Sequence, residues 1–137
     1  MTIVEKQRYL SRYRSLERQI TRETEELVRW RSLAEKITPS VSDTPRARRD
    51  GSRVEYAVEK IIVWEERLNG HLAELIELRG EIERAVLKLD DERCQRLLVL
   101  RYIDGLTWVA ISDEMGYEPD GNYVFRLHRK ALSMLEI

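Results

Sequence analysis

Apolar residues recur every three or four positions along the first 37 residues, and no glycine or proline interrupts them. Residues three and four apart share a face of a helix, so the repeat predicts one long helix with a single apolar face. Thr2 and Glu5 have the spacing of a capping box, which places the start of this helix beside Thr2. The apolar face is predicted to consist of Tyr13, Leu16, Ile20, Leu27, Trp30, Ala34 and Ile37.

A second long repeat follows a segment rich in Pro, Ser, Thr and Asp. The prolines favour a loop over residues 38–51, and Ser52 with Glu55 repeats the capping-box spacing at the start of a second helix. Two long amphipathic helices joined by one loop are expected to form an antiparallel, coiled-coil-like hairpin over residues 1–89. Its second apolar face contains Val54, Ala57, Val58, Ile61, Trp64, Leu68, Leu72, Leu75, Ile82, Val86 and Leu89, and the repeat continues through Asn69 and Gly70.

Shorter helical patterns, separated by turn residues, fill residues 90–137. Gly105 is expected to end the first of three helices and Gly116 the second. The predicted N-caps are Asp90, Thr107 and Asn122. No stretch alternates apolar and polar residues as a strand would. The predicted fold is therefore all-α, with a hairpin domain at 1–89 and a trihelical domain at 90–137.

The composition supports helices with solvated surfaces, because 36% of the 137 residues are charged and 42% are apolar. The net charge of −1 argues against a protein that coats polyanions. Residues 90–137 hold six Lys or Arg against nine Asp or Glu. A nucleic-acid site in this segment would therefore require acidic and basic side chains to lie on different faces.

Few residues are suited to catalysis or to metal binding. Cys94, His71 and His128 do not form a zinc ligand set, and there is no nucleophile motif or phosphate-binding loop. We therefore expect no enzymatic activity, cofactor or metal. No apolar run reaches the roughly 20 residues that span a bilayer, and charged residues interrupt the N-terminal region where a signal peptide would be apolar. A cytoplasmic protein without a membrane partner is expected.

Two consecutive segments, LLVLRYIDGLTWVAISDEMGY and VFRLHRKALSML, match a known pattern. They resemble the helix-turn-helix of sigma factor region four, and together with the upstream helices the chain is similar to small phage-encoded sigma-like regulators related to the ArpU and RinA late-gene activators. The turn after Gly116 is about two residues longer than in the pattern, and Val109 stands where a glutamate is usual. The matching positions are Arg101, Tyr102, Gly105, Leu106, Thr107, Ile111, Met115, Gly116, Val124, Ala131 and Leu132.

The resemblance implies a sequence-specific transcriptional regulator that reads promoter DNA with its last helix and contacts RNA polymerase or another partner. An arginine on the exposed face of such a helix can form two hydrogen bonds with guanine. A homodimer through the hairpin would suit two DNA half-sites. Transferred by position, the DNA-binding residues are Asn122, Tyr123, Arg126, Arg129 and Lys130, with Lys130 directed to phosphate.

A second basic cluster, in the predicted loop, is a further candidate for nucleic-acid contact. It consists of Arg46, Arg48, Arg49 and Arg53. Two other functions fit the same elements. One is a DNA-packaging protein of the small-terminase kind, which would assemble as a ring. The other is a sigma-mimicking interaction module that does not bind DNA, which the acidic balance of residues 90–137 would suit.

Overall fold

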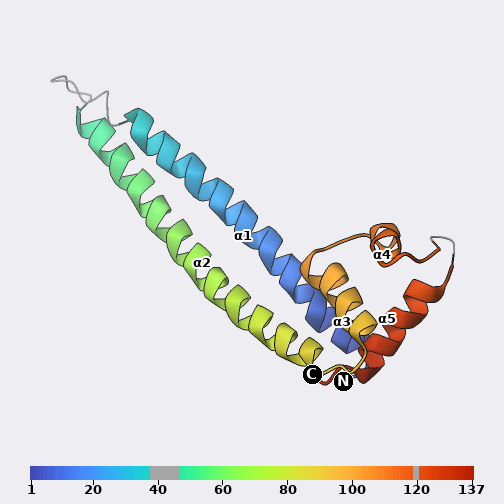
Figure 1. Ribbon diagram of the computed structural model, residues 1–137. Helices are drawn as coiled ribbons and strands as arrows, with labels where there is room; N and C mark the ends of the chain where they lie inside the picture. Colours follow the sequence, from blue (N-terminus) through green and yellow to red (C-terminus); the bar gives the residue numbers. More distant parts are fainter. Residues whose placement is uncertain (38–46, 119–120) are drawn as a thin grey trace. The chain divides into compact units, whose positions relative to one another are not determined.

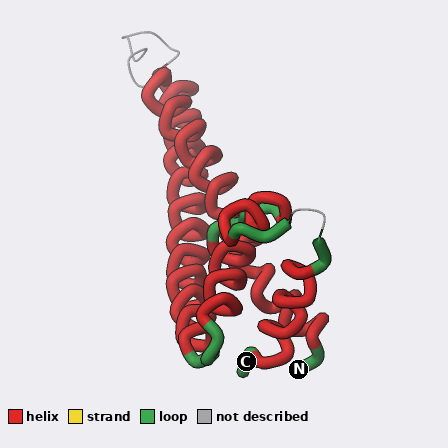
Figure 2. Tube along the Cα trace, turned by 45° about the vertical axis from the view of Figure 1, so that its right-hand side comes forward, coloured by secondary structure: helices red, strands yellow, loops and turns green. Residues whose placement is uncertain are grey.

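Every regular element in the parts of the chain that the structure describes is a helix (Figures 1 and 2). The computed structural model describes residues 1–37, 47–118 and 121–137, with backbone only for 47–50. The elements are α1 (Ile3–Ile37), α2 (Ala47–Leu87), α3 (Glu92–Leu98), a π-helical turn (Val99–Ile103), α4 (Trp108–Met115) and α5 (Tyr123–Met134). The predicted all-α fold, with two long helices followed by shorter ones, is confirmed.

The predicted capping box starts α1. The hydroxyl of Thr2 accepts a hydrogen bond from the amide of Glu5 at 3.1 Å, and the Glu5 carboxylate accepts one from the amide of Thr2 at 3.0 Å. These two bonds satisfy amides that have no partner within the helix. The helix is continuous over Ile3–Ile37, the range over which the apolar repeat predicted it.

The second capping box does not start α2. This helix begins at Ala47, so Ser52 lies more than one turn inside it, and the prediction of a loop through residue 51 was wrong at its end. Residues 38–46 of that predicted loop lie outside the described residues. Beyond Ser52 the helix is continuous through Asn69 and Gly70, as the uninterrupted apolar repeat indicated.

The chain forms two compact units, and both long helices contribute to each. The first unit contains Met1–Leu16 and Leu75–Ile137, and the second contains Glu17–Glu74. The contacts thus group both ends of the predicted hairpin with the C-terminal helices, which differs from a division at residue 89. Within each unit α1 and α2 run antiparallel (Figure 1). In the first unit Tyr9 bonds to Glu81 and Tyr13 to Arg79, so α2 is read backwards as α1 is read forwards. In the second unit Glu23 contacts His71 and Arg31 pairs with Glu65 in the same reversed order.

The first unit has a continuous apolar core supplied by all of its helices. Leu10, Ile82, Cys94, Leu97, Leu98, Ile111, Ala131, Leu132 and Leu135 have no more than 1% of their surface exposed. The C-terminal helix is also tied to the start of α1, because the Nζ atom of Lys6 donates to the carbonyl of Leu132 at 3.0 Å. Both chain ends belong to this unit. No described helix is both long and apolar enough to cross a membrane.

Local signals set the ends of the three shorter helices. Asp91, and not the predicted Asp90, caps α3, since its carboxylate accepts from the amide of Arg93. Thr107 caps α4 as predicted, and Gly116 ends it with a φ of +73°, a backbone conformation that favours glycine. Asn122 occupies the N-cap position of α5, but its side chain makes no capping hydrogen bond.

Candidate nucleic-acid interface

The helix α5 presents one buried face and one exposed face. The buried side chains are Val124, Leu127, His128, Ala131 and Leu132. Opposite them, at intervals of four, three and four residues, lie the exposed residues Asn122, Arg126, Arg129 and Ser133. We call these four residues the outer face of α5. Burial of five side chains fixes the rotation of the helix about its axis, so the outer face points away from the core.

The outer face is cationic. The sequence of α5 contains three Lys or Arg and no Asp or Glu. Arg126 and Arg129 are exposed, and among the described residues neither lies within ion-pairing distance of a carboxylate. Two arginines three residues apart on a helix extend over the same surface. This arrangement can bind an anionic partner or the acceptor edge of a base.

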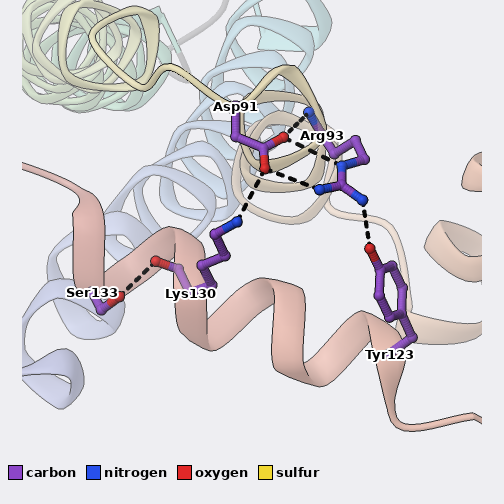
Figure 3. Close-up of polar contacts among 5 residues, drawn as sticks. All are labelled: Asp91, Arg93, Tyr123, Lys130 and Ser133. Carbon is purple, nitrogen blue, oxygen red and sulfur yellow. Dashed lines mark hydrogen bonds and ion pairs between the residues drawn. The ribbon is translucent and has the colours of Figure 1, made fainter.

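Tyr123 and Lys130 lie on a flank of α5 that faces α3 (Figure 3). The Nζ atom of Lys130 is 3.4 Å from the carboxylate of Asp91, and the guanidinium of Arg93 donates to the hydroxyl of Tyr123. The hydrogen bond from Arg93 lowers the pKa of Asp91 to about 2, so this carboxylate stays ionised beside Lys130. Of the five predicted DNA-binding residues, Asn122, Arg126 and Arg129 therefore share the outer face.

Phe125 occupies the opposite flank of α5 and was missed by the sequence prediction. The residue is 48% exposed, and its ring packs edge to face against Trp108 of α4 with the ring centroids 5.4 Å apart. Phe125 is four residues before Arg129, so the two side chains are neighbours on the helix. The signal for it was present in the sequence: an aromatic residue outside the buried spacing of the helix.

His128 stands on the buried face and contributes to packing. Its Nε2 atom lies 2.6 Å from the hydroxyl of Tyr102, and its ring centroid lies 4.6 Å from that of Trp108. Burial, and to a smaller extent the positive charge of Arg101, lowers the pKa of His128 to about 4. The imidazole is therefore neutral at pH 7, and the positive charge of α5 comes from its arginines and lysine.

The low pKa of His128 predicts a loss of stability in mild acid. The unfolded chain protonates this side chain near its ordinary pKa of 6.5 and the folded chain near 4, so between these values the unfolded state binds more protons. The free energy of unfolding should therefore fall as the pH decreases from about 6.5 to about 4, by roughly 2 kcal/mol after allowance for partial solvation of the ring. Urea unfolding at pH 7 and pH 4.5 measures this fall.

The variant His128→Gln is the matched comparison, because all carboxyl groups still titrate in it. The fall in stability should be smaller in this variant than in the wild type. A midpoint above pH 6 for His128 in the folded protein, followed by NMR, would contradict the assignment.

The second predicted cluster is described only in part. Arg46 lies outside the described residues, and Arg48 and Arg49 lie in the first turn of α2, where side chains are not described. Arg53 is exposed on α2 and lines a small pocket with Trp30 and Tyr56. Elsewhere, no three His, Cys, Asp or Glu side chains gather in a way that could hold a metal ion in the described part of the chain.

The fold and the site define an all-α protein in which two long helices precede a compact group of short helices with a cationic last helix. The chain belongs to a family described as protein of unknown function (DUF1492), whose match covers residues 49–136. This match includes nearly all of α2 and the whole of α3, α4 and α5. No curated protein and no solved structure shows significant similarity to it.

Proposed function

We propose that the protein is a sequence-specific DNA-binding regulator of transcription, encoded by a phage or prophage, that reads promoter DNA with α5. The observation that carries this proposal is the outer face of α5, where Arg126 and Arg129 are exposed beside Asn122 on a helix of fixed rotation. A recognition helix needs these two properties together, because arginine can form two hydrogen bonds with guanine only when its helix is held in register with the groove.

The helices before α5 support a helix-turn-helix. Thr107 caps the start of α4, and Gly116, with its left-handed backbone conformation, ends it. The short helix α4 is thus followed along the chain by α5. This is the order of elements in sigma factor region four, which the sequence resembles. The same resemblance supports a contact with RNA polymerase. Val109 of α4 is 68% exposed and is available for that contact.

The acidic balance of residues 90–137 is compatible with DNA binding, because two of its carboxylates pair with basic residues of α3. Asp91 accepts hydrogen bonds from Arg93, and Glu114 lies 3.6 Å from Arg96. Each of these pairs sets a positive charge beside a carboxylate of the segment. The absence of Asp and Glu from α5 itself supports a separation of basic and acidic side chains on this helix.

In vitro selection of bound duplexes tests the proposal. The full chain is incubated with a randomised duplex library at moderate salt, and the enriched sequences are measured by gel shift against a shuffled duplex. We expect one enriched motif bound at least 100-fold more tightly than the shuffled duplex, since specific binding exceeds non-specific binding by about a thousandfold or more in such proteins. Binding that is equal for all duplexes, or no binding, would favour the sigma-mimicking module instead.

We also propose that the regulator is a homodimer formed through its second unit. Leu27 and Ala57 are the buried apolar residues among those described in this unit, so its two helices have a thin core. On one flank of the unit Val28, Val58, Ile62 and Leu72 are between 37% and 59% exposed. The same surface of a second copy could cover this flank, as twofold symmetry requires.

The charges on this flank favour a second copy over a charged partner. Glu65 and Arg31 lie between its apolar residues and form an ion pair at 2.7 Å, so the pair carries no net charge. In such a dimer each copy would bury the aliphatic residues of the other. A dimer of this kind would carry two copies of α5.

Ile62→Lys is expected to convert the dimer into a monomer. The lysine would introduce an unpaired charge into the interface, which costs several kcal/mol when the charge is buried. Sedimentation equilibrium of the wild-type chain and of the variant measures the effect, and Val63→Lys on the other flank of α2 is the matched control. A wild-type monomer would contradict the dimer, and a ring of eight or more subunits would favour a packaging protein.

A further inference from the structure

An exposed aromatic ring borders the cationic outer face of α5. Phe125 has 48% of its surface exposed. Arg129, one helical turn later, is its neighbour on the same side of the helix. An apolar side chain and a guanidinium group therefore lie side by side on the surface that we propose for DNA.

The position of Phe125 is supported by edge-to-face contacts among aromatic rings. The Trp108 ring meets that of Phe125 edge to face, with an interplanar angle of 60°. Trp108 also contacts the guanidinium of Arg101, 4.4 Å from its centroid, and the ring of His128, whose centroid lies 4.6 Å away. Such contacts restrict the orientation of a ring beyond what area burial provides. Phe125 is thus held at the surface in a defined position.

We infer that Phe125 is a specificity-determining residue that contacts the 5-methyl group of a thymine beside the base read by Arg129. This inference rests on the proposed function of α5. The thymine methyl is the apolar group that B-DNA presents in the major groove, and phenylalanine is among the side chains that can contact it. Side chains four residues apart on a helix are separated by about 5–6 Å, which corresponds to one or two base-pair steps of 3.4 Å.

The charge around Phe125 favours DNA over a protein partner for this ring. A protein partner would be expected to meet an apolar patch with a polar rim. Here the ring lies next to an arginine without a carboxylate partner in the described residues, so an acidic polymer is better suited to cover both groups. Base edges offer the methyl group and the acceptor atoms within one groove.

The test replaces each thymine of the selected duplex, one at a time, by deoxyuridine, which lacks only the 5-methyl group. Affinity is measured by fluorescence anisotropy at fixed salt. Removal of one buried methyl group corresponds to about fourfold in affinity. With the wild-type chain we expect this loss at one thymine. With Phe125→Ala, which removes an exposed side chain, the same replacement should have no effect.

Met134→Ala is the matched control, since Met134 is an exposed apolar residue on the opposite flank of α5 and should leave the deoxyuridine effect unchanged. Equal binding of all deoxyuridine duplexes by the wild type would overturn the inference and leave DNA binding intact. A deoxyuridine effect that persists in Phe125→Ala would also overturn it, because another residue would then contact the methyl. If selection yields no preferred duplex, the proposed function and this inference both fall.

Discussion

Replacing His71 by leucine is expected to lower the free energy of unfolding by about 2–3 kcal/mol. The side chain of Glu23 is 1% exposed in the seam between α1 and α2, and the Nδ1 atom of His71 lies 2.6 and 2.9 Å from its two oxygens. Leucine would leave this buried carboxylate without its partner, and breaking a buried pair on one side costs several kcal/mol. His71 is 34% exposed, so water can reach the site and the loss lies at the lower end of that range.

The double variant Glu23→Leu with His71→Leu should recover most of this loss. Both leucine side chains would then pack between α1 and α2. Replacing a buried polar pair by packed apolar residues is often neutral or stabilising. Urea unfolding of the wild type, both single variants and the double variant gives the coupling between the two sites. Glu25→Leu, at an exposed position two residues away, is the control and should change stability by less than about 0.5 kcal/mol. Additive losses in the double variant would show that the pair is not coupled.

Glu23 and His71 also show which buried residues the hydrophobic pattern does not identify. Both continue the three-and-four spacing of the apolar faces, since Glu23 stands between Ile20 and Leu27, and His71 follows Leu68 by three. A search for apolar residues alone passes over them. Spacing places a residue in the seam, but only the contact across two helices, 48 residues apart in sequence, shows that each polar group has a partner.

The helix ends show the same distinction at short range. Thr2 and Thr107 were predicted correctly because each cap joins residues three apart, so the sequence contains the whole motif. Ser52 was not a cap because α2 begins upstream at Ala47, and nothing in the spacing of Ser52 and Glu55 excludes a position inside a helix. Asp91 rather than Asp90 caps α3 because of the path that the chain takes after α2. A local sequence motif does not contain this information.

Those features of the candidate interface that depend only on the residue spacing within α5 could be predicted from the sequence. The buried spacing of α5 fixes its rotation and thereby the exposure of Arg126 and Arg129. The position of Lys130 depends on Asp91, 39 residues away, and could not be read from the spacing within α5. The spacing within α5 places Phe125 outside the buried face, but only the contact with Trp108 of α4 shows that its ring is supported at the surface.

The double variant Arg126→Ala with Arg129→Ala is expected to reduce affinity for the selected duplex by at least about 30-fold. An arginine that forms two hydrogen bonds with guanine contributes about 1–3 kcal/mol of discrimination, and loss of two such contacts multiplies the effect. Affinity for the shuffled duplex should fall much less, so the preference for the motif should largely disappear. Gel shifts with both duplexes at two salt concentrations separate the loss of base contacts from the loss of charge.

Two further variants determine how this loss is interpreted. Arg8→Ala with Arg22→Ala removes the same charge from exposed positions of α1 and should change affinity less than threefold.

Asp91→Asn should act in the opposite direction, because it keeps a residue that can cap α3 while releasing Lys130 from its carboxylate. Binding to every duplex should then increase, and the salt dependence should steepen by about 0.9 for one added phosphate contact. If the double variant of α5 bound the motif as tightly as the wild type, the outer face of α5 would not be the reading surface.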